Sequence, residues 1–171
     1  MKKLMKCFTI LFTMLLFALS TFAQSTATAN VTATILQPIT ISKTIDMNFG
    51  NASVSAALGT IILNPLSSRS ASGGVLFLTS APGTITAASF TVTGYANATY
   101  TITLPLIATT VKFGGNTMLV DNWTSSPTAT GLLNGTGDQT LNVGATLHVA
   151  GNQAVGVYAQ TVPFSVTVNY N

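Results

Sequence analysis

The sequence of 171 residues predicts an all-β domain, built as an antiparallel sandwich or barrel. Short runs of alternating apolar and polar residues recur along the chain, which is the pattern of strands with one buried face. Gly, Asn and Pro residues separate these runs, as they do at turns. The chain has no Glu and only 5% charged residues, whereas amphipathic helices draw heavily on Glu, Lys and Arg.

The first 23 residues have the three parts of a secretory signal peptide. Residues 1–6 carry three lysines, residues 7–19 are apolar apart from two threonines, and Thr21 and Ala23 supply a small-residue cleavage site. The apolar run is shorter than the roughly 20 residues that a membrane-spanning helix needs. We therefore expect cleavage after Ala23 and a protein that is not integral to the membrane. The mature chain is expected at the cell surface, outside the cell or in the periplasm.

Removal of residues 1–23 would remove both the net charge of the chain and its single cysteine, Cys7. The formal charge of +3 comes from the three N-terminal lysines, since the three later cations balance three aspartates. Three scattered cations do not form a phosphate-binding face, so nucleic acid is not an expected partner. The mature chain would have neither a disulfide nor a thiolate site. A surface this poor in charge favours association.

The longest uninterrupted alternation is residues 26–35, which we expect to form the first strand of the mature chain. One face of this segment is small and apolar, and the other is mostly threonine; the apolar face consists of Ala27, Ala29, Val31, Ala33 and Ile35. Gln37-Pro38 ends the run, since proline cannot donate into a strand ladder. We expect a signal peptide at 1–23, the alternating strand at 24–36 and the sandwich domain at 37–171.

Further strands are expected at intervals of about 8–12 residues, roughly ten in all. They fall within residues 39–41, 45–49, 59–63, 75–78, 88–93, 100–104, 110–113, 117–120, 141–143, 146–149 and 162–170. Residues 66–72 are polar and are expected to form a loop. The last run places five larger side chains on one face, namely Val162, Phe164, Val166, Val168 and Tyr170.

The mature chain offers little for catalysis. Its one histidine, His148, is expected on the surface or on an edge strand; a catalytic role would need a nucleophile and an orienting acid. Asp46 is expected to face solvent, and Asp121 and Asp138 to lie near turns. No Gly-x-Ser-x-Gly turn, zinc-ligand spacing or phosphate-binding loop is present. We therefore expect no catalytic residue, no metal and no cofactor, and we expect the protein not to be an enzyme.

Two segments leave alternatives open. Residues 26–35 are either the first strand of their own sandwich or a donor strand that completes the sheet of another subunit. Trp123 and the tyrosines either pack in the core, which we favour, or form a platform on which sugars stack. The expected function is therefore a structural subunit that assembles by strand complementation, and the alternative is a monomeric secreted module or adhesin that binds glycans.

Several segments resemble the secreted family called domain of unknown function 4402. They are residues 37–41, 47–50, 90–94, 100–105, 141–147, 156–158 and 164–170. The chain is more distantly similar to spore coat protein U-type subunits and archaic chaperone–usher pilins, which commonly carry a disulfide that this chain lacks.

This resemblance implies an immunoglobulin-like, pilin-type sandwich that assembles into a surface fibre. The apolar face of residues 26–35 would be inserted into a neighbour, and the Val162–Tyr170 face would line the core beside the acceptor groove. The implied partners are further copies of the chain or related subunits, a periplasmic chaperone and an outer-membrane usher.

Overall fold

The structure is a computed structural model that describes residues 5–6 and 24–171. The predicted signal peptide lies outside these residues, apart from Met5 and Lys6. The chain divides into two units, residues 1–35 and residues 36–171. Every residue from 24 to 35 is exposed and none belongs to a strand. An alternating segment needs a neighbouring strand to satisfy its backbone N–H and C=O groups, and within its own unit residues 24–35 have none.

The second unit is built from antiparallel strands. They are β1 (Thr40–Ile45), β2 (Asn48–Phe49), β3 (Ser53–Leu63), β4 (Arg69–Leu76), β5 (Ile85–Thr86), β6 (Ala88–Thr93), β7 (Thr99–Thr103), β8 (Thr109–Phe113), β9 (Asn116–Ser126), β10 (Thr130–Leu132), β11 (Asp138–Val149), β12 (Ala159–Gln160) and β13 (Thr167–Tyr170). This arrangement confirms the predicted all-β antiparallel fold. None of the described residues belongs to a helix with the length and apolarity that crossing a bilayer requires.

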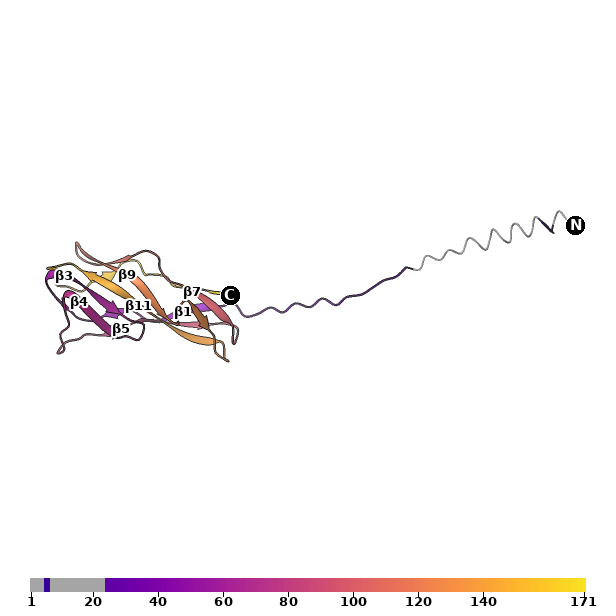
Figure 1. Cartoon of the computed structure of the whole chain (residues 1–171), viewed down its shortest axis with the longest axis horizontal. Helices are drawn as coiled ribbons and strands as arrows, with labels where there is room; N and C mark the ends of the chain where they lie inside the picture. Colours follow the sequence, from indigo (N-terminus) through magenta and orange to yellow (C-terminus); the bar gives the residue numbers. More distant parts are fainter. Residues whose placement is uncertain (1–4, 7–23) are drawn as a thin grey trace. The chain divides into compact units, whose positions relative to one another are not determined.

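The main sheet is organised around the long strand β11. Its strand order is β1-β6-β11-β9-β8-β12. Residues 138–143 of β11 pair with β6 and residues 145–149 pair with β3, so these two strands share one edge of β11. Strand β4 extends the sheet beyond β3. Figure 1 shows β3 and β4 at one end of this unit and β7 at the other, with β11 between them.

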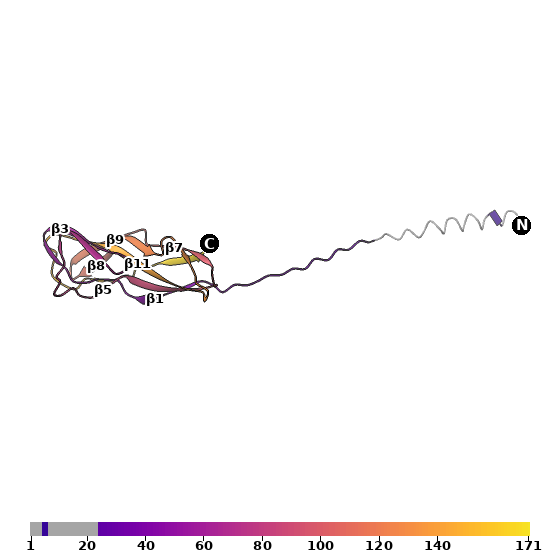
Figure 2. The same ribbon diagram turned by 60° about the horizontal axis from the view of Figure 1, so that its bottom comes forward.

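A second sheet, with the order β10-β7-β13, covers one half of the main sheet. The cluster between them contains Tyr100 of β7, Val168 of β13 and Leu141 of β11, all buried. Tyr100 is fully buried, and its hydroxyl donates a 2.8 Å hydrogen bond to Oε1 of Gln139. Figure 2 shows β7 and the C-terminus at this end of the unit.

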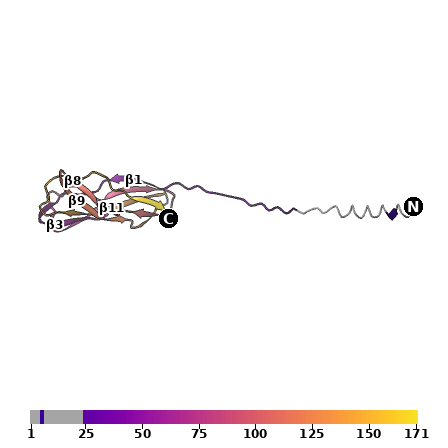
Figure 3. The same ribbon diagram turned by 90° about the horizontal axis from the view of Figure 1, so that it is seen from above.

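The other half of the main sheet has a core of its own. Its buried members come from β3, β4, β9 and the second half of β11, and none comes from the second sheet. The short β2–β5 ladder contributes Phe49 to this cluster. The sandwich therefore has a complete second layer over β6 and the first half of β11, and a sparser cover over β3 and β9. Figure 3 shows the positions of β3, β9 and β1 from above.

Residues 26–35, expected as the first strand, form no strand, and residues 162–166, expected in the last strand, precede β13. Two further local predictions from the sequence are also wrong. Residues 69–72, expected in a loop, are the first half of β4. Their poor strand propensity is offset by pairing with β3, where the hydroxyls of Thr60 and Ser72 are 2.7 Å apart. Asp121, expected near a turn, lies inside β9.

A β-bulge follows Asp121. Between Thr146↔Asp121 and Gly144↔Thr124 the register shifts, and Asn122 has a φ of 47°. The extra residue reverses the side-chain parity, so Trp123 packs against the core just as Val120 does before the bulge.

Candidate functional site

The candidate site begins at two free strand edges. Strand β1 pairs only with β6, and β13 pairs only with β7, so within residues 36–171 each has one edge without a partner. The two strands lie in contact with each other. The Tyr170 hydroxyl donates a 2.9 Å hydrogen bond to the carbonyl oxygen of Gln37, three residues before β1. We call this pair of free edges the β1–β13 seam.

Apolar side chains face inward along the seam. On the β1 side, Ile39 and Ile41 are half-buried against the core of the complete half of the sandwich. On the β13 side, the structure places the five predicted residues unevenly: Val168 is buried, Phe164, Val166 and Tyr170 are half-buried, and Val162 is 71% exposed. Val162 lies outside the core because residues 161–166 cross from β12 in the main sheet to β13 in the second, and Pro163 cannot donate into a ladder.

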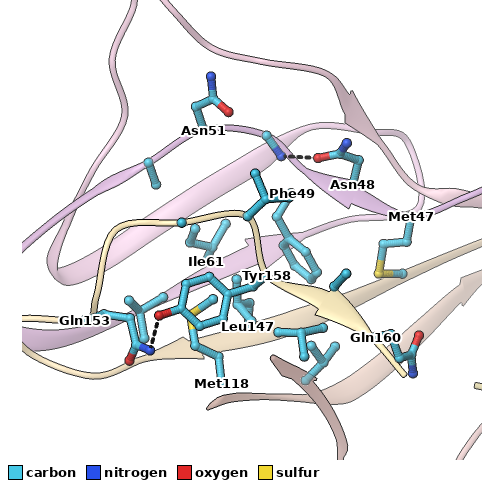
Figure 4. A pocket seen from close by; sticks show the side chains of 18 of the residues that line it. Met47, Asn48, Phe49, Asn51, Ile61, Met118, Leu147, Gln153, Tyr158 and Gln160 are labelled. Atoms are coloured by element: carbon cyan, nitrogen blue, oxygen red, sulfur yellow. Dashed lines mark hydrogen bonds between the residues drawn. The ribbon is translucent and has the colours of Figure 1, made fainter. Parts of the chain in front are cut away.

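A pocket of about 930 Å³ opens at one end of the seam. Its floor is the inner face of the main sheet, including Ile61, Met118 and Leu147. Figure 4 shows Met47 and Phe49, which follow β1, beside this floor. Phe164, which precedes β13, also lines the pocket. The pocket therefore begins where β1 ends and before β13 starts.

Residues 153–160 form another wall of the pocket. The Tyr158 hydroxyl donates to the carbonyl oxygen of Ala154 at 2.8 Å. It also accepts a 2.7 Å hydrogen bond from the Gln153 side chain (Figure 4). The Tyr158 ring lies 5.8 Å from that of Phe113. A Cβ at Gly156 would lie 2.3 Å from the Phe113 ring, so only glycine allows this close approach.

Arg69 of β4 supports the β2 wall. Its guanidinium donates to the carbonyl oxygens of Phe49 and Pro82, the latter at 3.1 Å, and lies 3.9 Å from the centre of the Phe77 ring. Burial lowers the pKa of Arg69 from its usual value, although the group remains cationic. This cation thus holds a wall of the pocket in place and has no carboxylate partner among the described residues.

Trp123 and Phe164 stand where the seam meets the pocket. Their ring centroids are 4.5 Å apart, and Phe164 also makes an edge-on contact with Phe90 at 6.3 Å. Trp123 packs against both core clusters, as the favoured sequence prediction has it. Its indole Nε1 is buried and finds no hydrogen-bond acceptor in the described part of the chain. A buried donor without an acceptor costs free energy, so this position favours an incoming oxygen.

No pattern in the sequence predicted a contact between His148 and Asp121, but the structure places these two side chains together. Nε2 of His148 lies 2.7 Å from a carboxylate oxygen of Asp121, on the partly exposed face of β11 and β9. His148 lies on a central strand, not an edge strand. No hydroxyl of the described residues is hydrogen-bonded to this imidazole.

The other two aspartates stand apart from this pair. Asp46 is exposed, as predicted, and pairs with Lys43 at 2.6 Å. Asp138 accepts hydrogen bonds from Thr93 and Thr136 at the start of β11. Residues 5–6 and 24–171 contain no group of three His, Cys, Asp or Glu side chains that could hold a metal ion.

The predicted donor face lies in the other unit. Ala27, Ala29 and Ala33 are exposed, as are Val31 at 95% and Ile35 at 92%. The side chains of Val31 and Ile35 are thus exposed to water, and burying either one would contribute about 1.5–3 kcal/mol of stabilising free energy. The sequence could predict this face because alternation with period two is visible without a partner.

The class of protein is therefore an antiparallel β-sandwich with two free edges leading to an apolar pocket. The chain belongs to the family called domain of unknown function 4402, whose model matches residues 39–170. No curated protein and no solved structure matches the chain.

Proposed function

We propose that this chain is a non-enzymatic structural subunit, exported from the cytoplasm, that assembles with further copies of itself by strand complementation. The N-terminal segment of one copy, residues 26–35, occupies the β1–β13 seam of the next. The subunits form a fimbrial or other surface fibre in this proposal. The export step rests on the signal-peptide pattern of residues 1–23.

One observation carries the proposal. A ten-residue alternating segment has no strand partner, and the sandwich has two adjacent strand edges without partners. Natural sheets normally protect such edges, because free N–H and C=O groups recruit other strands. A strand added to an edge gains main-chain hydrogen bonds and places every second side chain against the core. Insertion of residues 26–35 at the seam would give hydrogen-bond partners both to this segment and to the free edges of β1 and β13.

The experiment is to delete Thr26–Ile35 from the full chain and to examine the exported protein on unboiled gels. We expect the ladder of polymers to disappear. A finer comparison is Val31→Asn, on the apolar face, against Thr32→Asn, on the opposite face; only the first should weaken the ladder. Polymers that persist unchanged in the deletion variant would rule the proposal out.

A periplasmic chaperone and an outer-membrane usher are proposed as assembly partners. A subunit with an open seam exposes apolar side chains before its neighbour arrives, and such a surface associates unless it is covered. Genes for both partners beside the gene of this chain are the expected finding. The glycan-binding alternative loses the part of its motivation that rested on Trp123, since this ring packs against the core.

A further inference from the structure

The outer face of the main sheet is the side that faces away from the core. Leu119 of β9 is 50% exposed there, although the next residue of the strand is buried in the core. His148 of β11 and Thr110 of β8 are the residues opposite Leu119, so they share this face. Lys112 and Asp121, each two residues further along its strand, belong to the same face. We call these five residues the outer patch.

The outer patch carries a cation without a partner. Lys112 is exposed, and its ammonium group makes no ion pair or hydrogen bond with the described residues. The other two cations of residues 24–171 are engaged, because Lys43 pairs with Asp46 and Arg69 donates to main-chain carbonyl oxygens. Lys112 is therefore available to an anion outside its own chain.

The anion of the outer patch also has a free oxygen. Oδ1 of Asp121 lies 2.7 Å from Nε2 of His148, whereas Oδ2 has no hydrogen-bond partner in the described part of the chain. Lys112 is opposite Thr117, and Asp121 is four residues further along β9, so the two charged residues are about 14 Å apart. Their side chains cannot bridge that distance, so these charges do not pair within one copy.

We infer that the outer patch binds the outer patch of a second copy of this chain, with a twofold axis beside Leu119. Leu119 lies close to the midpoint between the two charges. Rotation about an axis that crosses the strands at this point brings Lys112 of each copy over Asp121 of the other. Two ion pairs and a contact between the two Leu119 side chains then form together. Such a contact is self-complementary and closes at two copies. The opposite charges fix the register, because a shift separates both pairs.

This contact and the proposed strand exchange use different parts of the main sheet. In the strand order β1-β6-β11-β9-β8-β12, the outer patch begins at β11, and β6 separates it from the free edge of β1. A subunit can therefore make both contacts at once. One contact is small, and exposed ion pairs are individually weak. Where the subunits form a fibre, which rests on the proposed function, the contact recurs on every subunit and joins fibres side by side with an affinity raised by repetition.

Cross-linking through a single introduced cysteine tests the twofold contact, since residues 24–171 contain no native cysteine. In the full chain with Cys7→Ser, Leu119→Cys places two thiols near the axis. Thr140→Cys is the matched control, because Thr140 is exposed on the same face of β11 but lies outside the outer patch. Sheets packed face to face lie about 10 Å apart, which is further than a disulfide spans, so a short bismaleimide reagent joins the thiols.

We expect a covalent dimer from Leu119→Cys, and none above background from Thr140→Cys. The gels are run after boiling in detergent, which separates chains joined only by strand exchange. The deletion of residues 26–35 thus tests the proposed function separately, and the dimer should persist in its absence. Equal dimer yields from the two cysteines would overturn the inference.

Charge reversal tests the register. Lys112→Glu and Asp121→Lys, each added to the Leu119→Cys chain, put like charges at both pairs, so either variant alone should lose about five-fold in dimer yield. Mixing the two variants should restore the yield, because both pairs of a mixed dimer then have opposite charges. A mixture that stays as low as its components would overturn the inference.

The response to salt provides a second readout if Asp121→Lys does not fold. Added salt screens attraction in the native patch and repulsion in the Lys112→Glu variant. The dimer yield of the Leu119→Cys chain should therefore fall as salt is added, and that of the same chain with Lys112→Glu should rise. The same response in both chains would overturn the inference.

Discussion

The hydroxyl of Tyr170 joins the last strand to the chain just before the first, because it donates to the carbonyl oxygen of Gln37 at 2.9 Å. The hydroxyl oxygen of Tyr170 also accepts a 2.6 Å hydrogen bond from the backbone N–H of Tyr95. A Cβ at Gly94 would lie 2.2 Å from this hydroxyl, so a glycine gives it room. One hydroxyl thus connects three segments and defines the end of the seam that lies away from the pocket.

The first prediction is that Tyr170→Phe destabilises the domain by about 1–2 kcal/mol, since it removes one donor and one acceptor from this junction. Urea titration of the full chain, followed by tyrosine and tryptophan fluorescence, measures the change. The matched control is Tyr95→Phe, at a half-exposed ring, which should leave the midpoint within error. Equal effects of the two substitutions would contradict a special role for the Tyr170 hydroxyl.

The second prediction concerns Gly131, directly opposite Tyr100 in the β10–β7 pair. A Cβ at Gly131 would lie 2.2 Å from Cζ of the fully buried Tyr100 ring, so Gly131→Ala must displace the ring or the strand. Overpacking of this kind costs about 1–3 kcal/mol. Gly135→Ala is the control, because nothing lies within 4 Å of its Cβ position. The two melting temperatures should differ clearly, with only Gly131→Ala lowered.

Strands with strict alternation could be predicted from the sequence, whereas features that depend on pairing could not. Residues 88–93 and 100–104 alternate cleanly and correspond to β6 and β7. Arg69–Ser72 gave no such pattern, and their place in β4 follows from the register with β3. The bulge at Asn122 is invisible for the same reason, since only the mismatch with β11 reveals the extra residue.

The candidate site likewise has one part that could be predicted from the sequence and another part that depends on strand pairing. The apolar face of residues 26–35 is visible as a period-two pattern, because it depends on one segment alone. The pocket combines β2, β3, β9, β11 and residues 153–160, whose meeting depends on sheet order. The pairing of His148 with Asp121 likewise needs the β11–β9 register, in which Asp121 is opposite Thr146.

The third prediction concerns alkaline pH. Burial raises the pKa of the Tyr100 hydroxyl above its ordinary value of 10.0. In the unfolded chain this tyrosine ionises near pH 10, while in the folded domain it stays protonated. Its contribution to stability is therefore complete below about pH 10 and is lost as the pH rises toward the raised value.

Urea midpoints between pH 8 and pH 11 measure this loss. The Tyr100→Phe variant should be less stable at pH 8, since the hydrogen bond to Gln139 is gone. It should also lose less stability than the native chain as the pH rises. Parallel curves for the two proteins would show that another group causes the alkaline loss.

The fourth prediction uses the unpaired indole of Trp123. Trp123→Phe removes ring area, which weakens packing against Phe164, but it also removes a buried N–H that has no acceptor in residues 24–171. An unsatisfied buried donor costs about 1–3 kcal/mol, so removing it offsets much of the lost packing. We expect Trp123→Phe to change the free energy of unfolding by less than about 1 kcal/mol in chains that lack strand exchange, whereas Trp123→Ala should cost about 3 kcal/mol or more.

Chains with Thr26–Ile35 deleted provide the background for this comparison, with unfolding followed by circular dichroism because fluorescence changes with the tryptophan itself. In the full chain the same Trp123→Phe substitution should be more costly, since an inserted strand would supply the missing acceptor and the variant could no longer use it. A cost that is identical in the two backgrounds would mean that no oxygen of a neighbouring strand reaches Nε1. A larger cost in the full chain than in the deletion background would therefore indicate a hydrogen bond between subunits.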